Sequence, residues 1–175
     1  DERQTIQLRL GTLLHDKDPQ AAISALSSAV ADGAAASETL DTICALAREA
    51  RIPEHAAQEL RQAADIARDT GNRIHLLTRA AELYASELGN RHEAAEILEM
   101  ARLDAPEDKS ILESLADMYR LLGQAEELQA VLHGLEEHVR EDSFERFEEV
   151  RLERARILHE FLASDVEAGR ILREV

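Results

Sequence analysis

One helical pattern recurs through this chain and limits what the chain can fold into. A small or apolar residue is followed four positions later by leucine, and three positions after that by alanine or another apolar residue. The copies begin at Ala22, Ala56, Ala94, Leu128 and Ala168, so successive copies lie 34, 38, 34 and 40 residues apart. Spacings of four and three place these residues on one face of an α-helix. The pattern therefore predicts five amphipathic helices.

A further apolar helix is expected before each copy. These preceding runs contain Leu10-Gly11, Ile43-Cys44, Ala80, Leu115-Ala116 and Ala155. Residues that end helices lie between the runs, namely Gly33, Gly71-Asn72, Gly89-Asn90, Pro106 and Gly123-Gln124. Ser37 and the capping-box spacing of Ser110 and Glu113 fit helix starts. Because no sustained strand-like alternation occurs, the sequence predicts an all-α fold of about five antiparallel helix pairs.

Composition narrows the classes of partner. Asp and Glu number 36 against 20 Lys and Arg, which gives a formal net charge of −16. Such a charge repels phosphate backbones and anionic lipids, so nucleic-acid binding is not expected, whereas a basic partner is attracted. No apolar run is long enough to cross a membrane, so no membrane insertion is expected. The chain begins with Asp1 rather than Met, and we therefore expect a fragment of a longer protein whose targeting segment, if any, lies outside it.

The repeat resembles the tetratricopeptide repeat (TPR) family, whose units are helix–turn–helix pairs of about 34 residues. The match is carried by Ala94, Leu98, Ala101 and Pro106 in the third unit and by Leu115, Ala116, Tyr119 and Gly123 in the fourth. The resemblance implies a right-handed α-solenoid in one repeat domain over residues 1–175. Its units are roughly 4–36, 37–72, 75–108, 109–142 and 143–175.

In the TPR family the first helix of each pair lines a concave, partner-binding face. This resemblance implies a row of candidate contact residues: Thr5, Thr12, Asp41, Arg48, Arg79, Leu83, Ser110, Glu113, Asp117 and Arg120. Leu8, Leu76 and Leu83 sit at spacings that suit core packing equally well. The positions of the family's carboxylate clamp hold Asp41, Thr42, Ala45, Ser110 and Ser114, so a basic or amphipathic peptide is expected rather than an acidic tail.

Chemistry-bearing motifs are sparse. The two histidines of "HGLEEH", His133 and His138, are five residues apart and do not share a helix face as zinc ligands must. No nucleophile elbow, phosphate-binding loop or dinucleotide fingerprint occurs. Cys44 is the only cysteine, and we expect it to be a buried, inert packing residue. No catalytic residue, metal or cofactor is therefore expected.

The last forty residues leave two questions open. The charged run 136–154 contains an apolar stripe of Phe144, Phe147 and Val150, which fits either the first helix of the fifth pair or a helix that docks a neighbouring chain. Ile171, Leu172 and Val175 either pack back on residues 144–158 or form an uncovered apolar end through which the chain self-associates.

The predicted function is a non-catalytic scaffold that binds a partner protein or peptide. The alternative is a structural or regulatory spacer, or a self-association segment, of a large multidomain protein. An open polar groove would favour the first function, and a filled or featureless groove would favour the second.

Overall fold

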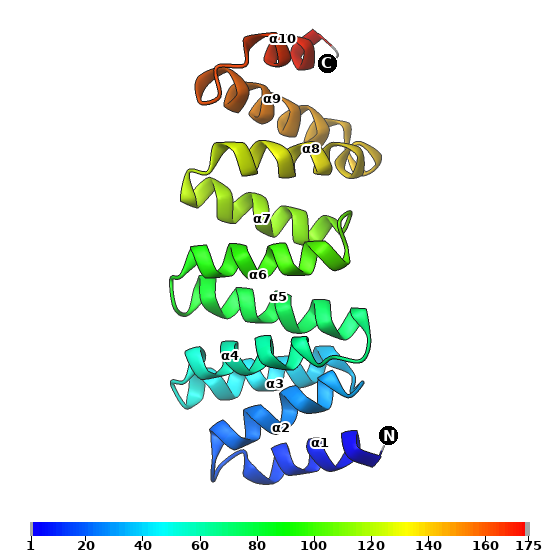
Figure 1. Cartoon of the computed structure of the whole chain (residues 1–175), viewed down its shortest axis with the longest axis vertical. Coiled ribbons are helices and arrows are strands. Elements are labelled where there is room, and N and C mark those ends of the chain that lie inside the picture. Colours follow the sequence, from blue (N-terminus) through cyan, green and yellow to red (C-terminus); the bar gives the residue numbers. More distant parts are fainter. Residues whose placement is uncertain (1, 174–175) are drawn as a thin grey trace. The chain divides into compact units, whose positions relative to one another are not determined.

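The computed structural model describes residues 2–173, apart from the side chain of residue 142, and all regular structure in that range is α-helical. The ten helices are α1 (Glu2–Leu14), α2 (Pro19–Ala31), α3 (Ala36–Glu49), α4 (Pro53–Asp65), α5 (Thr70–Ser86), α6 (Arg91–Asp104), α7 (Lys109–Leu122), α8 (Ala125–Asp142), α9 (Phe144–Glu160) and α10 (Asp165–Arg173). Successive helices pack in adjacent pairs (Figure 1). The all-α prediction is confirmed for the described residues.

The helices divide into two compact units. Unit 1 is Asp1–Ala105 and contains α1–α6, and unit 2 is Pro106–Val175 and contains α7–α10. The boundary falls at Pro106, where the sequence predicts a break between the third and fourth pairs. A proline cannot donate a backbone hydrogen bond and disfavours helix in the residue before it, which explains why α6 ends at Asp104. That the five predicted units form one repeat domain remains a prediction.

In unit 1, close helix contact depends on small residues. A Cβ atom added to Gly11 of α1 would lie 2.5 Å from Cγ of Leu26 on α2, so only glycine fits at this crossing. Leu26 of α2, Leu60 of α4 and Leu98 of α6 are buried, as the repeat pattern predicts. Glu96 of α6 is exposed. The predicted register therefore identifies the buried face of each second helix.

Aspartate and asparagine, rather than the predicted serines, cap several helices. At the start of α7, Oδ1 of Asp108 accepts a hydrogen bond from the backbone N–H of Ile111 at 3.1 Å, so the expected capping box of Ser110 and Glu113 does not form the cap. Ser37 likewise lies inside α3, whose N-cap is Ala35. The predicted helix starts are confirmed, because α3 begins at Ala36 and α7 at Lys109, each one residue before the serine; the predicted capping box was wrong because Asp108 supplies the cap of α7.

Asn72 joins helices that are distant in sequence. The sequence placed Gly71-Asn72 in a linker, but both residues lie in the first turn of α5, which Asp69 caps. From there the Asn72 Nδ2 amide donates to the carbonyl oxygens of Val30 at 2.7 Å and Ala34 at 3.1 Å. These carbonyls lie at and just after the C-terminal end of α2, where helix carbonyls lack partners of their own. The contact fixes the start of α5 against the end of α2.

In unit 2, α8 packs between α7 and α9, and α10 packs on α9. Leu132 of α8 and the α9 residues Phe147 and Val150 are buried, whereas Phe144 is exposed. The charged run 136–154 thus supplies the end of α8 and most of α9, and its apolar stripe is largely core, which favours the first of the two interpretations.

The end of unit 2 is partly covered. Ile171 is buried in a cluster with Ala155, Leu158 and Ala168, so this residue packs back on α9. Leu172 is half-exposed, and Val175 lies outside the described residues. Of the two alternatives that the sequence left open, packing back on α9 therefore holds for Ile171, whereas Leu172 stays partly uncovered.

Candidate interaction surface

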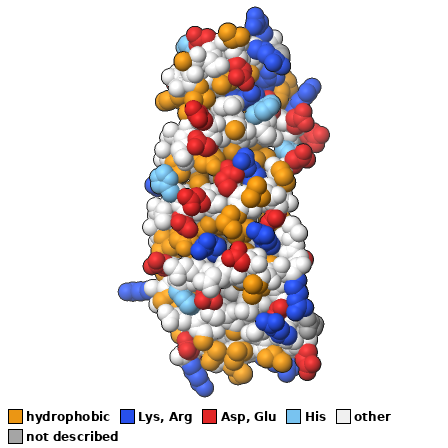
Figure 2. Space-filling model, in the orientation of Figure 1, with side chains coloured by type: hydrophobic (Ala, Val, Ile, Leu, Met, Phe, Trp, Pro, Cys, Tyr) orange, Lys and Arg blue, Asp and Glu red, His pale blue; other side chains and the backbone are white. Residues whose placement is uncertain are grey.

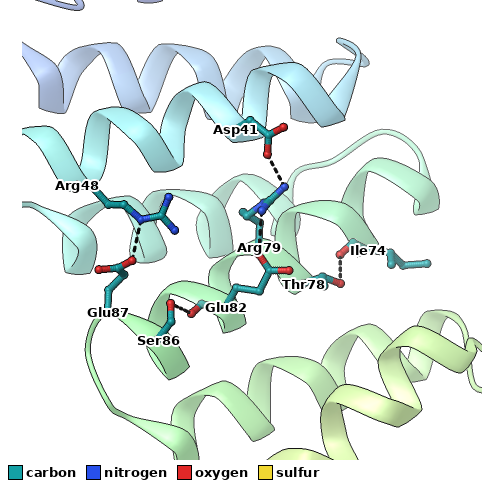
Figure 3. A network of polar contacts seen from close by, with 8 residues as sticks. All are labelled: Asp41, Arg48, Ile74, Thr78, Arg79, Glu82, Ser86 and Glu87. Atoms are coloured by element: carbon teal, nitrogen blue, oxygen red, sulfur yellow. Dashed lines mark hydrogen bonds and ion pairs between the residues drawn. The ribbon is translucent and has the colours of Figure 1, made fainter.

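In unit 1 the predicted row on the first helices is occupied by ion pairs. Nη2 of Arg79 on α5 contacts Oδ1 of Asp41 on α3 at 2.7 Å, and its Nη1 contacts Oε2 of Glu82 at 2.9 Å (Figure 3). Nε of Arg48 on α3 contacts Oε1 of Glu87 at 2.7 Å. This hydrogen bond to Glu87 raises the pKa of Arg48. Both guanidinium groups are therefore held by carboxylates of the same unit.

Cys44 lies on α3 beneath this row. Its thiol is buried, which confirms the predicted packing position. Burial raises the pKa of the Cys44 thiol, while the charges of Arg79 and Arg48 oppose that shift. Since the thiolate is the reactive form, a raised pKa makes the residue less nucleophilic.

In unit 2, an arginine at the repeat position of Arg48 joins two first helices. Arg120 of α7 makes a two-point contact with Glu153 of α9, with Nε to Oε1 at 2.6 Å and Nη2 to Oε2 at 2.8 Å. Its Nη1 also donates to Oδ1 of Asp117 at 2.7 Å. The hydrogen bond to Glu153 raises the pKa of Arg120, so its positive charge is fixed in place between two carboxylates.

Three of the predicted row residues meet at one pocket of unit 2. Its volume is about 210 Å³, and it lies among α7, α8 and α9. The lining residues are Glu113, Ala116, Asp117 and Arg120 of α7, Leu135 and Val139 of α8, and Arg146 and Val150 of α9. Arg146 pairs with Glu149 at 2.9 Å. The Glu113 side chain is exposed and takes part in no ion pair within the described chain.

The remaining row residues are placed differently. Thr5 and Thr12 are exposed on α1, where the Thr12 hydroxyl donates to the Leu8 carbonyl of its own helix. Ser110 is exposed in the first turn of α7. Leu83 is 1% exposed and belongs to the core of unit 1, so it cannot contact a partner. Its spacing from Leu76 and Ala80, which are also buried, is the core spacing that the sequence left open.

A buried polar network in unit 2 was missed in the sequence. Arg154 of α9 is 6% exposed. It donates to Oε1 of Gln129 at 2.9 Å and Oε1 of Glu136 at 2.7 Å, both on α8, and to Oε1 of Glu167 on α10 at 3.3 Å. The sequence predicts an exposed Gln129, but this residue is half-buried because it occupies a repeat position where Ile23 and Ala57 are also buried. The network ties three helices together.

A sequence signal for this network exists. Each first helix carries a small residue at the same repeat position: Gly11, Cys44, Ala81, Ala116 and Ala155. The residue directly before it is Leu10, Ile43, Ala80, Leu115 and Arg154 in the five units. A charged residue at an otherwise apolar position indicates a compensating partner, because an unpaired buried charge is costly. Neighbouring Arg151 is also buried, with Nη2 donating to the Ile171 carbonyl at 2.9 Å and its guanidinium 5.2 Å from the centre of the Phe147 ring.

Neither a metal site nor a membrane span is found between residues 2 and 173. No three histidine, cysteine, aspartate or glutamate side chains in that range are grouped to hold a metal ion. His133 contacts Glu136 at 3.7 Å, and His159 contacts Asp165 at 2.7 Å. None of the ten described helices has the length and apolar character needed to cross a bilayer.

Charges of both signs are interspersed on the face shown in Figure 2, where no large block of one sign is seen. Local geometry, rather than a uniform field, must then decide where a partner binds. Comparison with known proteins adds no family: no family model, curated protein or solved structure matches this chain.

Proposed function

We propose that this chain is a TPR-like, right-handed α-solenoid of about five helix pairs that acts as a non-catalytic scaffold for a partner protein. The proposal rests on the repeating register, which places equivalent leucines of the second helices in the cores of both units. Stacked repeats present the first helices as an extended surface, and such surfaces are commonly used for binding.

The binding site is the pocket among α7, α8 and α9. The single observation that carries this assignment is the convergence of Glu113, Asp117 and Arg120 on one cavity of about 210 Å³. Ala116, Leu135, Val139 and Val150 supply apolar walls. A long side chain with a charged end fits such a site, because its methylene groups pack on the apolar walls while its charge reaches the rim.

The ligand group is a lysine or arginine side chain of an amphipathic peptide. Arg120 is already bound by Asp117 and Glu153, and Arg146 by Glu149, so neither cation is available to an anion without breaking an existing pair. Of the two carboxylates that line the pocket, Asp117 pairs with Arg120, and Glu113 pairs with no cation of the described chain. The net charge of −16 also steers cationic partners toward the chain and phosphate-rich polymers away from it.

Unit 1 has a structural role in this proposal. Arg48 and Arg79 are held by Glu87, Asp41 and Glu82. The charged side chains of the row on α3 and α5 are therefore already paired within the unit, and a filled groove of this kind is what the sequence analysis expects of a spacer. The two predicted functions thus belong to different parts of the chain, with unit 2 binding the partner and unit 1 supporting it.

Selection from a displayed library of amphipathic peptides tests the proposal. Binders to the whole chain should be enriched in lysine and arginine, and their affinity should be measured by fluorescence anisotropy. Glu113→Gln combined with Asp117→Asn should weaken binding about tenfold or more, since a hydrogen bond to a charged group contributes about 1.5–3 kcal/mol. Glu96→Gln, at an exposed position of α6, is the control that removes a negative charge away from the pocket.

Two results would contradict the assignment. Enrichment of acidic peptides would mean that the pocket does not select cations. Equal affinity of the paired variant and the Glu96→Gln control would mean that the peptides bind elsewhere on the chain.

A further inference from the structure

A second pocket of unit 2, which we call the apolar pocket, lies beside the peptide pocket described above. Its volume is about 290 Å³, and its lining includes Tyr119, Leu128, Ile157 and Phe161. The first three are buried residues of α7, α8 and α9. Phe161, which directly follows α9, is 66% exposed. An aromatic ring exposed at the edge of an apolar pocket gains buried area when another apolar group enters.

The charged groups around the apolar pocket are already paired. Arg120 contacts Glu153 at 2.6 Å, and both residues line the pocket. Arg156, the third charged residue of the lining, contacts Glu160 at 3.4 Å. A charged ligand group would have to break one of these pairs or remain unpaired beside apolar walls, and either is costly. The pocket therefore suits an uncharged, apolar group.

The volume of the apolar pocket limits the size of its occupant. Pockets that hold drug-sized ligands usually measure about 300–1,000 Å³. At about 290 Å³, the apolar pocket lies below that range. It therefore suits a single large apolar side chain better than a separate small molecule.

One face of α9 lines both pockets. Arg146 and Val150 line the peptide pocket, and Glu153 and Ile157 line the apolar pocket. These four residues are spaced by four, three and four positions, so they lie on the same side of the helix. The two pockets therefore follow one another along α9.

The helices α7 and α8 show the same continuity. On α7, Ala116 lines the peptide pocket, Gly123 lines the apolar pocket, and Arg120 between them lines both. On α8, Leu135 lines the peptide pocket and Leu128, seven residues earlier on the same helix face, lines the apolar pocket. The two pockets are thus neighbouring parts of one channel whose walls are α7, α8 and α9.

The ion pair of Arg120 and Glu153 crosses this channel. It joins α7 to α9 by contacts of 2.6 and 2.8 Å. A peptide that reaches both pockets must therefore place one side chain on each side of the pair. Val150 and Ile157, one in each pocket, are seven residues apart on α9, which corresponds to about 10 Å along the helix axis. An extended peptide covers that distance in about three residues, and a helical peptide in about seven.

We propose that the apolar pocket is a second subsite for the same peptide and takes a leucine, methionine or phenylalanine side chain. This proposal rests on the peptide-binding function proposed above and adds a sequence requirement to it. The peptide must carry its apolar residue at one fixed spacing from the lysine or arginine in the peptide pocket. Because the ion pair stands between the two subsites, it sets that spacing and the register of the bound peptide.

Selection from a displayed library with one fixed lysine tests the spacing. Seven randomised positions lie on each side of the lysine, and the whole chain is the target. Leucine, methionine or phenylalanine should be enriched at one spacing. Ala125→Leu, at a half-buried residue that lines the apolar pocket, puts a larger side chain into it and should abolish this enrichment. Enrichment at no single spacing, or enrichment that persists with Ala125→Leu, overturns the proposal.

Phe161→Ala tests the same pocket by affinity. Fluorescence anisotropy should show that a selected, fluorescein-labelled peptide binds this variant about fivefold or more weakly, as is common when an aromatic contact residue is truncated. Leu121→Ala is the matched control, since Leu121 is 60% exposed on α7 and lines neither pocket. It should bind the peptide like the unaltered chain. Both positions are exposed, so the melting curves of the two variants should match that of the unaltered chain.

The same peptide with alanine in place of its apolar residue completes the test. It should bind the unaltered chain about tenfold or more weakly. It should also bind Phe161→Ala and the unaltered chain equally, because the contact with Phe161 is already gone. If Phe161→Ala weakens both peptides to the same extent, or weakens neither, the apolar subsite is overturned.

The paired variant Glu113→Gln with Asp117→Asn separates this proposal from the one on which it rests. If that variant weakens binding but Phe161→Ala does not, the peptide pocket stands and the apolar subsite is refuted. If neither weakens binding, the proposed function is refuted and the subsite with it.

Discussion

Replacing Arg154 by leucine should destabilise unit 2 by about 3–5 kcal/mol, the usual cost of removing one partner from a buried ion pair. The main loss comes from Glu136, whose side chain is 14% exposed and which would keep a charge without its cation. Gln129 would lose a hydrogen bond of 2.9 Å. Glu167 adds little, because its side chain is 47% exposed and water can replace the arginine.

The repeat itself supplies the compensating substitutions. The positions equivalent to Gln129 and Glu136 hold Ile23 and Val30 in α2 and Ala57 and Ala64 in α4, all buried and apolar. Combining Arg154→Leu with Gln129→Ala and Glu136→Val should therefore recover the stability to within about 1 kcal/mol, since well-packed apolar replacements of a buried pair are often neutral or stabilising.

Urea unfolding followed by circular dichroism provides the measurement, with midpoints compared at equal slope. Because the pair is buried, the effect of Arg154→Leu should change little between low and high salt. The reasoning is refuted if Arg154→Leu costs less than about 1 kcal/mol, or if the triple variant is no more stable than the single one.

Further changes test the core and the helix contacts. Leu98→Ala should cost about 2–5 kcal/mol in urea unfolding while Glu96→Ala stays within about 0.5 kcal/mol; equal midpoints would show that the repeat register is misassigned. The Cys44 thiol should react with a disulfide reagent far more slowly in the folded chain than in urea, because it is buried and its raised pKa lowers the fraction of reactive thiolate at any pH near or below that pKa. Equally fast reaction of the folded chain would contradict its burial. Gly11→Ala should lower the free energy of unfolding by about 1–3 kcal/mol, because the added carbon would overlap Leu26. Gly169→Ala, with open space around the added carbon, should instead stabilise α10 by up to about 1 kcal/mol. Melting temperatures that shift in the same direction for both variants would refute this contrast.

Periodicity predicted the fold well because burial repeats. Leu26, Leu60, Leu98 and Leu132 are all in the core, and Gly33, Gly89 and Gly123 have the positive φ values expected of residues that follow helix ends. These features depend on local spacing and backbone conformation, which a single sequence records directly.

The candidate site could be predicted only in part. The row of first-helix positions included Glu113, Asp117 and Arg120, which line the pocket, but also Leu83, which is buried. A helical spacing cannot tell which of two adjacent faces meets a neighbour. Arg48, Arg79 and Arg120 each have a partner on another helix or at its end, namely Glu87, Asp41 and Glu153, that lies 33 to 39 residues away along the chain. Such pairings become visible only when helices are placed side by side.

Asn72 has a consequence for how this protein could gain or lose repeats. Repeat arrays are usually treated as chains of nearest-neighbour couplings, in which one unit can be removed and its neighbours joined. The two hydrogen bonds from Asn72 to Val30 and Ala34 link α5 to the end of α2, past α3 and α4. Deletion of the α3–α4 segment would place a different helix start beside α2 and leave these carbonyls without their donor. Evolution by loss of that segment would therefore need a second change that supplies a new amide at the same place, so the four helices α2–α5 would be inherited as a block rather than as interchangeable modules.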